Sequence, residues 1–347
     1  MKMEGRGAPA RIGSLIGLFL SALAFPGAAL ADRPASDELV ISGSQWIADA
    51  PTRVAALAGY FDSDTGPPIR VDMADSGKQS LERLMAGDAD FALMASVPLA
   101  MTIVRLHHKG APFEDWPVVL ASVGLSNQTH HLIADSRRGI QQPVDLAGQA
   151  LGLPFDTSAH FGWDLFADFH GIARNSVRLV ETRPHALAGG LAAGRLDAVV
   201  AWSPLSTQIL DQLGGHARSF ALRGMDSVSW LLVCRRSLIA RHPEAVTRVL
   251  QGYAEAIDFL HTDPVGASAL LDQSPDWLRE TGIAWKLSLD WPVLSNMEAK
   301  LKWSARRLGV APVSLSPHRY IERAPLQQFQ PNAVNLPIWS DDGGVEQ

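Results

Sequence analysis

Two stretches of the chain, about one hundred residues apart, repeat the same order of apolar and polar positions. In each, an apolar helical pattern stops at a glycine (Gly87 and Gly194), and a short apolar run follows at residues 91–95 and 198–201. A glycine at that place suits a helix C-terminus, where the backbone takes a positive φ. An apolar run without alternation is typical of a strand buried on both faces of a parallel sheet. The repeat therefore predicts two α/β units of the same kind.

Ser96 and Ser203 follow the two apolar runs, where a ligand is held in open α/β sheets, beyond the carboxyl ends of the strands. We therefore expect an α/β fold of two lobes, each a mainly parallel sheet flanked by helices, with a ligand cleft between them. The alternative is a chance repetition of helix–glycine–strand units. The remaining pattern predicts lobe one over residues 32–124 and 226–310, lobe two over 125–225, and a C-terminal tail over 311–347. Past residue 242 it predicts mostly helix, over 243–261, 264–272, 276–286 and 292–308.

The N-terminal segment has the features of a secretory signal. Three basic residues, Lys2, Arg6 and Arg11, precede an apolar run at residues 12–25, and small residues follow up to Ala31. The run is short of the roughly 20 apolar residues that span a bilayer. We expect residues 1–31 to be a signal peptide cleaved after Ala31, in preference to a retained anchor.

Charge and cysteine content narrow the class of partner. The whole chain carries a formal net charge of −6, and removal of three basic residues and Glu4 with the signal changes it to −8. An acidic chain argues against nucleic acid or an anionic membrane as a partner.

The single cysteine, Cys234, lies in an apolar run, so we expect a buried, inert thiol and a fold without an internal disulfide.

The strongest local candidate for a binding site is the segment that contains Thr157 and Ser158. It follows the strand expected at residues 150–153 and opens a helix, whose free N–H groups and dipole favour an anion. An ordinary helix cap is the commoner role of such residues by themselves, whereas their position at the C-terminal edge of a strand favours contact with a ligand. Trp202, beside Ser203 at a strand tip, suits the organic part of a ligand or packing between helices. Gln45 and Trp46 occupy the similar position in lobe one.

Motifs of bond-making chemistry are missing from the sequence. Residues 76–80 (SGKQS) lack the glycine and the Ser or Thr that a phosphate-binding loop needs, and no nucleophile elbow, zinc-protease motif or Cys-x-x-Cys pair occurs. The two histidine pairs, 107–108 and 130–131, suit surface or cap roles better than metal binding. We therefore expect no metal, no cofactor and no catalytic residue. His160, with Asp156 or Asp164, is the one faint acid–base candidate for an enzyme.

Several short motifs in a characteristic order resemble the substrate-binding proteins of nitrate/sulfonate/taurine-type ABC importers, over roughly residues 38–270. They are Gly87-Asp-Ala-Asp90-Phe, Asp145-Leu-Ala-Gly148, Leu151-Gly-Leu-Pro154, Thr157-Ser-Ala-His160, Gly171-Ile, Ala193-Gly194-Arg-Leu-Asp197-Ala, Trp202-Ser-Pro204 and Arg241-His-Pro243. The resemblance implies a type II periplasmic-binding-protein fold that holds a small solute between its lobes. It further implies a periplasmic, monomeric protein that passes the solute to a membrane permease and its ATPase.

The resemblance also implies a set of ligand-binding positions on both sides of the cleft. These are Gln45, Trp46, Ser96, Gln128, Thr129, Thr157, Ser158, Trp202 and Ser203, with Asp226 and Ser229 as weaker candidates. His160 is a further candidate from its own position, because it could lie one turn into the helix that Thr157 and Ser158 open. No arginine falls at a strand tip, and the two tryptophans suit a larger organic body. The pyrimidine-precursor-binding branch of the fold, an enzyme on the same fold, and a periplasmic sensor subunit therefore stay open as alternatives.

Overall fold

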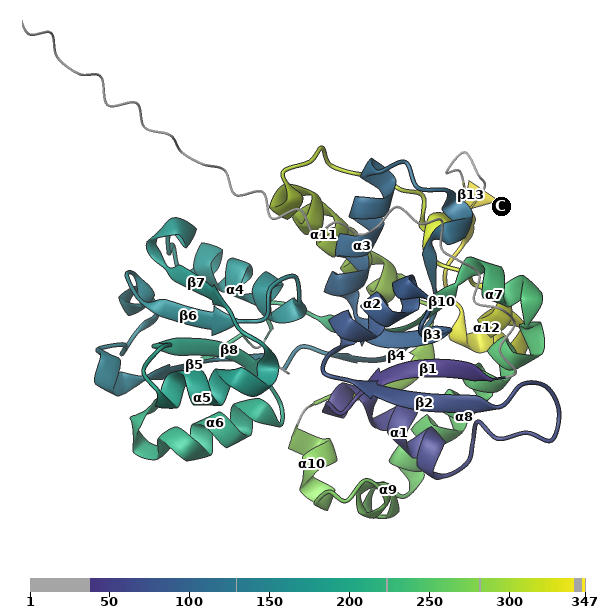
Figure 1. Cartoon of the computed structure of the whole chain (residues 1–347), viewed down its shortest axis with the longest axis horizontal. Helices are drawn as coiled ribbons and strands as arrows, with labels where there is room; N and C mark the ends of the chain where they lie inside the picture. The colour runs from purple at the N-terminus through teal and green to yellow at the C-terminus, as the bar shows by residue number, and fades with distance from the viewer. Residues whose placement is uncertain (1–37, 129, 223, 281, 340–344, 347) are drawn as a thin grey trace, which may run out of the picture.

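Two large β-sheets organise the chain in the computed structural model (Figure 1), which describes residues 38–128, 130–222, 224–280, 282–339 and 345–346. A small third sheet pairs β12 (Ile338–Trp339) with β13 (Val345–Glu346) near the C-terminus. The expected signal peptide at residues 1–31 and the candidate Thr129 lie outside the described residues. We call the six-stranded sheet with its helices lobe one and the five-stranded sheet with its helices lobe two. Their strand orders are β11-β4-β10-β3-β1-β2 and β7-β6-β8-β5-β9.

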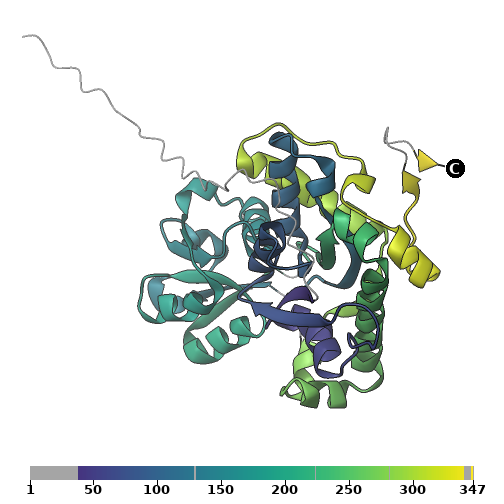
Figure 2. The same cartoon turned by 45° about the vertical axis from the view of Figure 1, so that its right-hand side comes forward.

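The strands of lobe one are β1 (Leu39–Ser44), β2 (Ile69–Ala74), β3 (Phe91–Ala95), β4 (Pro117–Ser126), β10 (Val228–Arg235) and β11 (Ala284–Ser288). Those of lobe two are β5 (His130–Asp135), β6 (Ala150–Leu153), β7 (Arg178–Glu181), β8 (Ala198–Trp202) and β9 (Ala217–Ala221). The chain passes between the two sheets twice, from β4 to β5 and from β9 to β10 (Figures 1 and 2). The exact division of the lobes at residues 125 and 225 stays a prediction.

Both sheets are mixed, and the expectation of mainly parallel sheets is wrong. β1 pairs in parallel with β2 and β3, and β6 pairs in parallel with β7 and β8. The strands next to the crossings run the other way: Trp230 of β10 lies opposite Ala95 at the end of β3, and His130 of β5 lies opposite Trp202 at the end of β8. A strand that arrives from the other lobe enters at the edge where its neighbour ends, and therefore runs antiparallel to it.

Helices cover the sheets and pack between the lobes (Figure 1). In lobe one they are α1 (Ala50–Leu57), α2 (Gly77–Ala86), α3 (Ser96–His108), α7 (Arg236–Arg241), α8 (Pro243–Thr262), α9 (Pro264–Leu270), α10 (Pro275–Glu280), α11 (Trp291–Leu308) and α12 (Ala324–Phe329). In lobe two they are α4 (Ser158–Phe169), α5 (Leu187–Ala192) and α6 (Leu205–Leu213). The predicted glycine stops are confirmed, because Gly87 and Gly194 have φ of 86° and 66°.

The helix predicted over residues 276–286 is wrong beyond Glu280. Residues 284–288 form β11, in which Ala284 pairs with Leu125 of β4. Trp285 and Leu287 are buried and Lys286 between them is exposed, which is the alternation of a strand with one buried face. Gly282, with φ of 56°, separates the two elements.

The tail beyond residue 310 packs on lobe one over its described part. The backbone N–H of Val119 in β4 donates to the carbonyl of Tyr320 at 2.8 Å, and Val119 forms a parallel bridge with Ile321. Tyr320 and Leu326 are fully buried. Cys234 is buried in β10, as expected, and burial raises the pKa of its thiol.

A second contact between the lobes is formed by helices. Val97 and Met101 of α3, Phe161 of α4 and Trp303 of α11 form one buried apolar cluster. Trp303 Nε1 also donates to a carboxylate oxygen of Asp164 on α4 at 2.8 Å. Helices α3 and α11 lie side by side in lobe one (Figure 1), so both face α4 across this contact.

Candidate ligand-binding site

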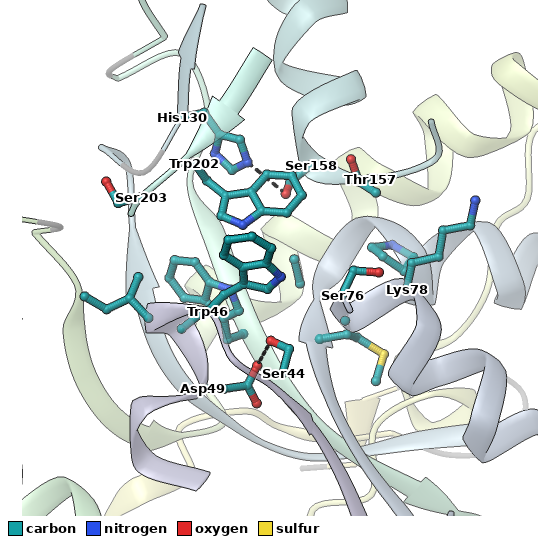
Figure 3. Close-up of a pocket in the computed structure, with 17 residues that line it drawn as sticks. Ser44, Trp46, Asp49, Ser76, Lys78, His130, Thr157, Ser158, Trp202 and Ser203 are labelled. Carbon is teal, nitrogen blue, oxygen red and sulfur yellow. Dashed lines mark hydrogen bonds between the residues drawn. The ribbon is translucent and has the colours of Figure 1, made fainter. Parts of the chain in front are cut away.

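A cavity lies between the two lobes, next to the helix contact (Figure 3). Its polar and aromatic lining comes from Ser44, Trp46, Asp49, Ser76, Lys78 and Trp230 of lobe one and from His130, Thr157, Ser158, Trp202 and Ser203 of lobe two. The cavity volume is about 60 Å³. One water molecule needs about 10–15 Å³ on this measure, so the cavity in this state fits only a small solute.

Three helices begin at the cavity. Gly77 and Lys78 of α2, Ala95 and Pro98 at the start of α3, and Ser158 of α4 all line it. The first N–H groups of a helix have no partner within the helix, and the helix dipole is positive at that end. The three N-termini therefore produce a positive potential in the cavity, which favours an anion.

At the N-terminus of α4, Thr157 occupies the N-cap position, but the cap role that the sequence also allowed is not the one its side chain takes. The Thr157 hydroxyl donates to the carbonyl of Pro154 at 2.7 Å and does not cap the helix. By contrast, Ser76 caps α2 by accepting from the N–H of Gln79. The first turn of α4 thus has no side-chain cap from its own N-cap residue.

Lys78 adds a full positive charge to the cavity wall. Its ammonium group donates to the carbonyl of Phe155 at 3.3 Å, so a lobe-one side chain contacts the lobe-two loop that precedes Thr157. Lys78 stands in the segment that the sequence analysis rejected as a phosphate-binding loop. That motif is absent, but Lys78, in the first turn of α2, is part of the cavity lining.

Aromatic rings form the organic wall of the cavity. The rings of Trp46 and Trp202 meet across the lobes edge to face, with centroids 5.6 Å apart and planes at 84° (Figure 3). Trp46 Nε1 donates to the carbonyl of Asp75 at 2.7 Å, which orients the indole. Trp230, missed by the sequence analysis as a lining residue, faces the same space from β10.

His130 lies on the cavity wall, so the expected surface or cap role is wrong for this histidine. Its Nε2 atom is 3.1 Å from the hydroxyl oxygen of Ser158, and its ring lies 5.9 Å from the ring of Trp202. Burial, with smaller contributions from His131 and Lys300, lowers the pKa of His130 to about 3. The imidazole is therefore neutral near pH 7.

Ser44 and Asp49 were also missed, although they flank the predicted Trp46. Asp49 is only 3% exposed, and its carboxylate accepts from the hydroxyls of Ser44 and, at 3.3 Å, Thr52. Burial is the main cause that raises the pKa of Asp49 to about 7, and these hydrogen bonds offset it only in part. The signal available in the sequence was their position, because Ser44 ends the first strand and Asp49 follows shortly after it.

Five of the predicted ligand-binding residues lie together at the cavity: Trp46, Thr157, Ser158, Trp202 and Ser203. Three other predicted positions lie outside the lining of this cavity, and their role in binding stays a prediction. Gln45 is exposed and is not part of the lining. Ser96, the first residue of α3, is turned towards α11, where its hydroxyl donates to the Asn296 side-chain oxygen at 2.6 Å. Gln128 lies against Gly282, outside the lining.

His160 and the weaker candidates also lie behind the cavity. His160 is buried, its Nδ1 atom accepts from the backbone N–H of Asp156 at 3.3 Å, and its ring packs on Trp303. Asp226 is paired with the buried ammonium group of Lys300. Ser229 is fully buried, because side chains alternate along β10 and its neighbour Trp230 takes the cavity side.

The described part of the chain shows neither a cluster of metal ligands nor a membrane-spanning helix. There, no three His, Cys, Asp or Glu side chains come together as metal ligands. Within the same residues, no helix combines the length and the apolar character that a bilayer crossing needs.

The two sheets, the double crossing and the cavity between the lobes define a type II periplasmic-binding-protein fold. The chain belongs to the NMT1/THI5-like family, whose model matches residues 47–267, more than half of the chain. The taurine-binding periplasmic protein of Escherichia coli (strain K12) is 25% identical over 198 residues. That match covers 56% of this chain and 58% of the relative, so the chain matches little more than half of the relative's length.

Solved structures support the same fold. The alkanesulfonate-binding protein SsuA from Xanthomonas axonopodis pv. citri, bound to MOPS, superposes with a TM-score of 0.69 at 18% identity, over 84% of this chain and all of that chain. The periplasmic nitrate-binding protein NrtA from Synechocystis PCC 6803 gives a TM-score of 0.63 at 13% identity, over 86% and 89%. At these identities the likeness concerns the fold alone.

Proposed function

We propose that the protein is an exported solute-binding protein that captures a small organic anion, of the sulfonate, nitrate or taurine class, between its lobes. The observation that carries this proposal is the meeting of three helix N-termini and Lys78 at one small cavity with an aromatic wall. The positive potential holds the anionic group, and Trp46 and Trp202 contact the organic part. The names of the taurine-, alkanesulfonate- and nitrate-binding relatives support this ligand class.

The same proposal covers the cellular setting. The protein leaves the cytoplasm with a signal peptide cleaved after Ala31, works as a periplasmic monomer, and delivers its solute to the permease and ATPase of an ABC importer. Relatives with periplasmic binding functions support this setting. A sensor subunit that presents the loaded protein to a membrane receptor would use the same cavity.

Solute binding without turnover is better supported than an enzyme. The histidine that could act as a base, His160, accepts from the Asp156 backbone and is buried against Trp303. Asp164 in turn accepts from Trp303. These groups are occupied by structural contacts behind the cavity, whereas a catalytic base must reach the reacting atoms.

The proposal is tested by a thermal-shift screen of the protein comprising residues 32–347, followed by calorimetry. The panel contains ethanesulfonate, taurine, nitrate, carboxylates, pyrimidines and aromatic acids. A ligand that binds only the folded state raises its apparent stability, by about 2.7 kcal/mol at a hundredfold excess over its dissociation constant. We expect a shift with an anion that is recovered unchanged. A shift by neutral pyrimidines alone, or consumption of the compound, would contradict the proposal.

A variant pair locates the site. Ser158→Ala removes a hydroxyl from the first turn of α4 and should weaken anion binding by about 1–3 kcal/mol. Ser176→Ala is the matched control, because that hydroxyl donates to the Ala173 carbonyl in the same lobe, away from the cavity. Equal affinities for the two variants would place the ligand elsewhere.

A further inference from the structure

An acidic side chain, Asp49, lines the cavity that is proposed to bind an anion, where a second negative charge is unexpected. Asp49 and Ser44 both line the cavity and are bonded to each other (Figure 3). An ionised carboxylate a few ångströms from a bound anion would repel it, and burial makes the repulsion larger. A carboxyl in this position therefore needs either a cationic partner or a proton.

Asp49 forms no ion pair among the described residues, although the charge of nearby Arg53 lowers the pKa of Asp49 and so offsets a small part of the effect of burial. Arg53 of α1 directs its guanidinium to the carbonyl of Leu271 at 3.2 Å, and over the described residues no ion pair of Asp49 is found. From α8, the Tyr253 hydroxyl lies 2.8 Å from that of Thr52, which contacts Asp49. The remaining titratable side chains are at the cavity wall itself: the ammonium group of Lys78 on α2 and the neutral imidazole of His130 on β5.

We propose that Asp49 is a specificity-determining residue that holds a proton in the loaded protein, so that capture of one anion takes up one proton from solvent. This inference rests on the proposed function. Protonated Asp49 donates to the Ser44 hydroxyl oxygen, and the Ser44 hydroxyl proton is then free to be donated to the anion. Asp49 thereby acts on the ligand through Ser44.

The count of hydrogen-bond donors supports the mechanism. A serine hydroxyl has one proton to donate. While Asp49 is ionised, the Ser44 hydroxyl donates this proton to the Asp49 carboxylate, and the Ser44 oxygen has only lone pairs left for the cavity. Once Asp49 is protonated, the direction of the bond reverses and the cavity gains a donor. The proton is available near neutral pH, because burial raises the pKa of Asp49 to about 7 and a nearby anion raises it further.

The expected pH dependence follows from the same linkage. If the anion binds only the form with protonated Asp49, its apparent dissociation constant rises with the fraction of ionised Asp49, by about tenfold between about pH 6 and about pH 8. Ethanesulfonate and nitrate are suitable probes, because neither titrates in this range. His130, with its pKa lowered to about 3, stays neutral throughout and adds no dependence.

The experiment is calorimetry of the wild-type protein with both probes, in two buffers of different ionisation enthalpy. We expect tighter binding at the lower pH, with uptake of nearly one proton per anion at about pH 8 and almost none at about pH 6. Asp49→Asn supplies a permanent N–H donor to Ser44 and should bind with the low-pH affinity at both values. Asp75→Asn, an exposed acid beside Trp46, should keep the wild-type dependence.

The outcomes separate the two proposals. Binding that is independent of pH, or stronger at higher pH, overturns the role of Asp49 and leaves the solute-binding function intact. No binding of any anion at either pH removes the proposed function and this inference with it. If the Asn variant does not fold, the proton uptake measured on the wild-type protein decides alone.

Discussion

Asp156, in the loop of lobe two that precedes Thr157, forms ion pairs with two side chains of lobe one. A single substitution can remove its charge without a change in the backbone. One carboxylate oxygen accepts from Arg105 of α3 at 2.9 Å, and the other lies 4.0 Å from the guanidinium of Arg307 on α11. Asp156 has φ of 60°, a region that asparagine also adopts readily. Asp156→Asn therefore keeps the backbone beside Thr157 and abolishes both ion pairs.

The magnitude follows from exposure and distance. The side chains of Arg105 and Arg307 are each 38% exposed and that of Asp156 is 20% exposed, so solvent screens both pairs. Pairs of this kind contribute about 0.2–1 kcal/mol, and the pair with Arg307 lies at the distance limit. A total of about 1 kcal/mol corresponds to about a fivefold change in an equilibrium constant. We expect ethanesulfonate to bind about fivefold more weakly, because a ligand between lobes needs both lobes in place.

The assay is calorimetry with ethanesulfonate at low salt and at about 1 M salt, where the screening length falls to about 3 Å. The difference between wild type and Asp156→Asn should shrink at high salt. Asp168→Asn is the matched control, because this exposed residue of α4 pairs with Arg174 inside lobe two. Equal affinity of wild type and variant at low salt, or a loss that salt leaves unchanged, would refute the reasoning.

Three further results are expected. Trp202→Ala should weaken the binding of any ligand in the cavity by about tenfold, as measured by calorimetry. Trp291, which is 58% exposed and lies outside the cavity lining, is the control, and Trp291→Ala should leave the affinity unchanged. Lys78→Met should weaken nitrate binding by about tenfold. Equal nitrate affinity of wild type and variant would show that the Lys78 ammonium group does not contribute to the site. Burial lowers the pKa of His160 in the folded protein to about 4, whereas in the unfolded chain this histidine titrates near pH 6.5. Below about pH 6.5 the unfolded chain therefore binds a proton that the folded state does not, and the folded state loses stability. The free energy of unfolding in urea should therefore differ between wild type and His160→Gln by about 1–2 kcal/mol less at about pH 5 than at about pH 7. A difference that stays constant with pH would contradict the lowered pKa of His160.

Local signals in the sequence determined much of the fold and part of the candidate site. The glycine stops at Gly87 and Gly194 and the apolar strands before Ser96 and Trp202 are properties of consecutive residues, so they could be predicted from the sequence. Because ligands bind at strand ends in this class of sheet, Thr157 and Ser158 could be placed at the cavity in the same way. Such arguments do not give the direction in which a side chain turns, and the hydroxyl of Ser96 is bonded to Asn296 outside the cavity lining.

The tertiary structure decided the remainder, because it depends on elements that are far apart in the chain. The three helix N-termini meet at the cavity only after two lobes have assembled around it. His130 and Trp202 became neighbours through the antiparallel pairing of β5 with β8. The pKa of Asp49 is raised only because tertiary packing, which includes Tyr253 some two hundred residues away, removes its carboxyl group from water, and neither the hydrogen bonds nor the charge of Arg53 offsets this burial fully. Spacing and composition determine the elements, whereas burial and the meeting of distant residues determine the chemistry of the site.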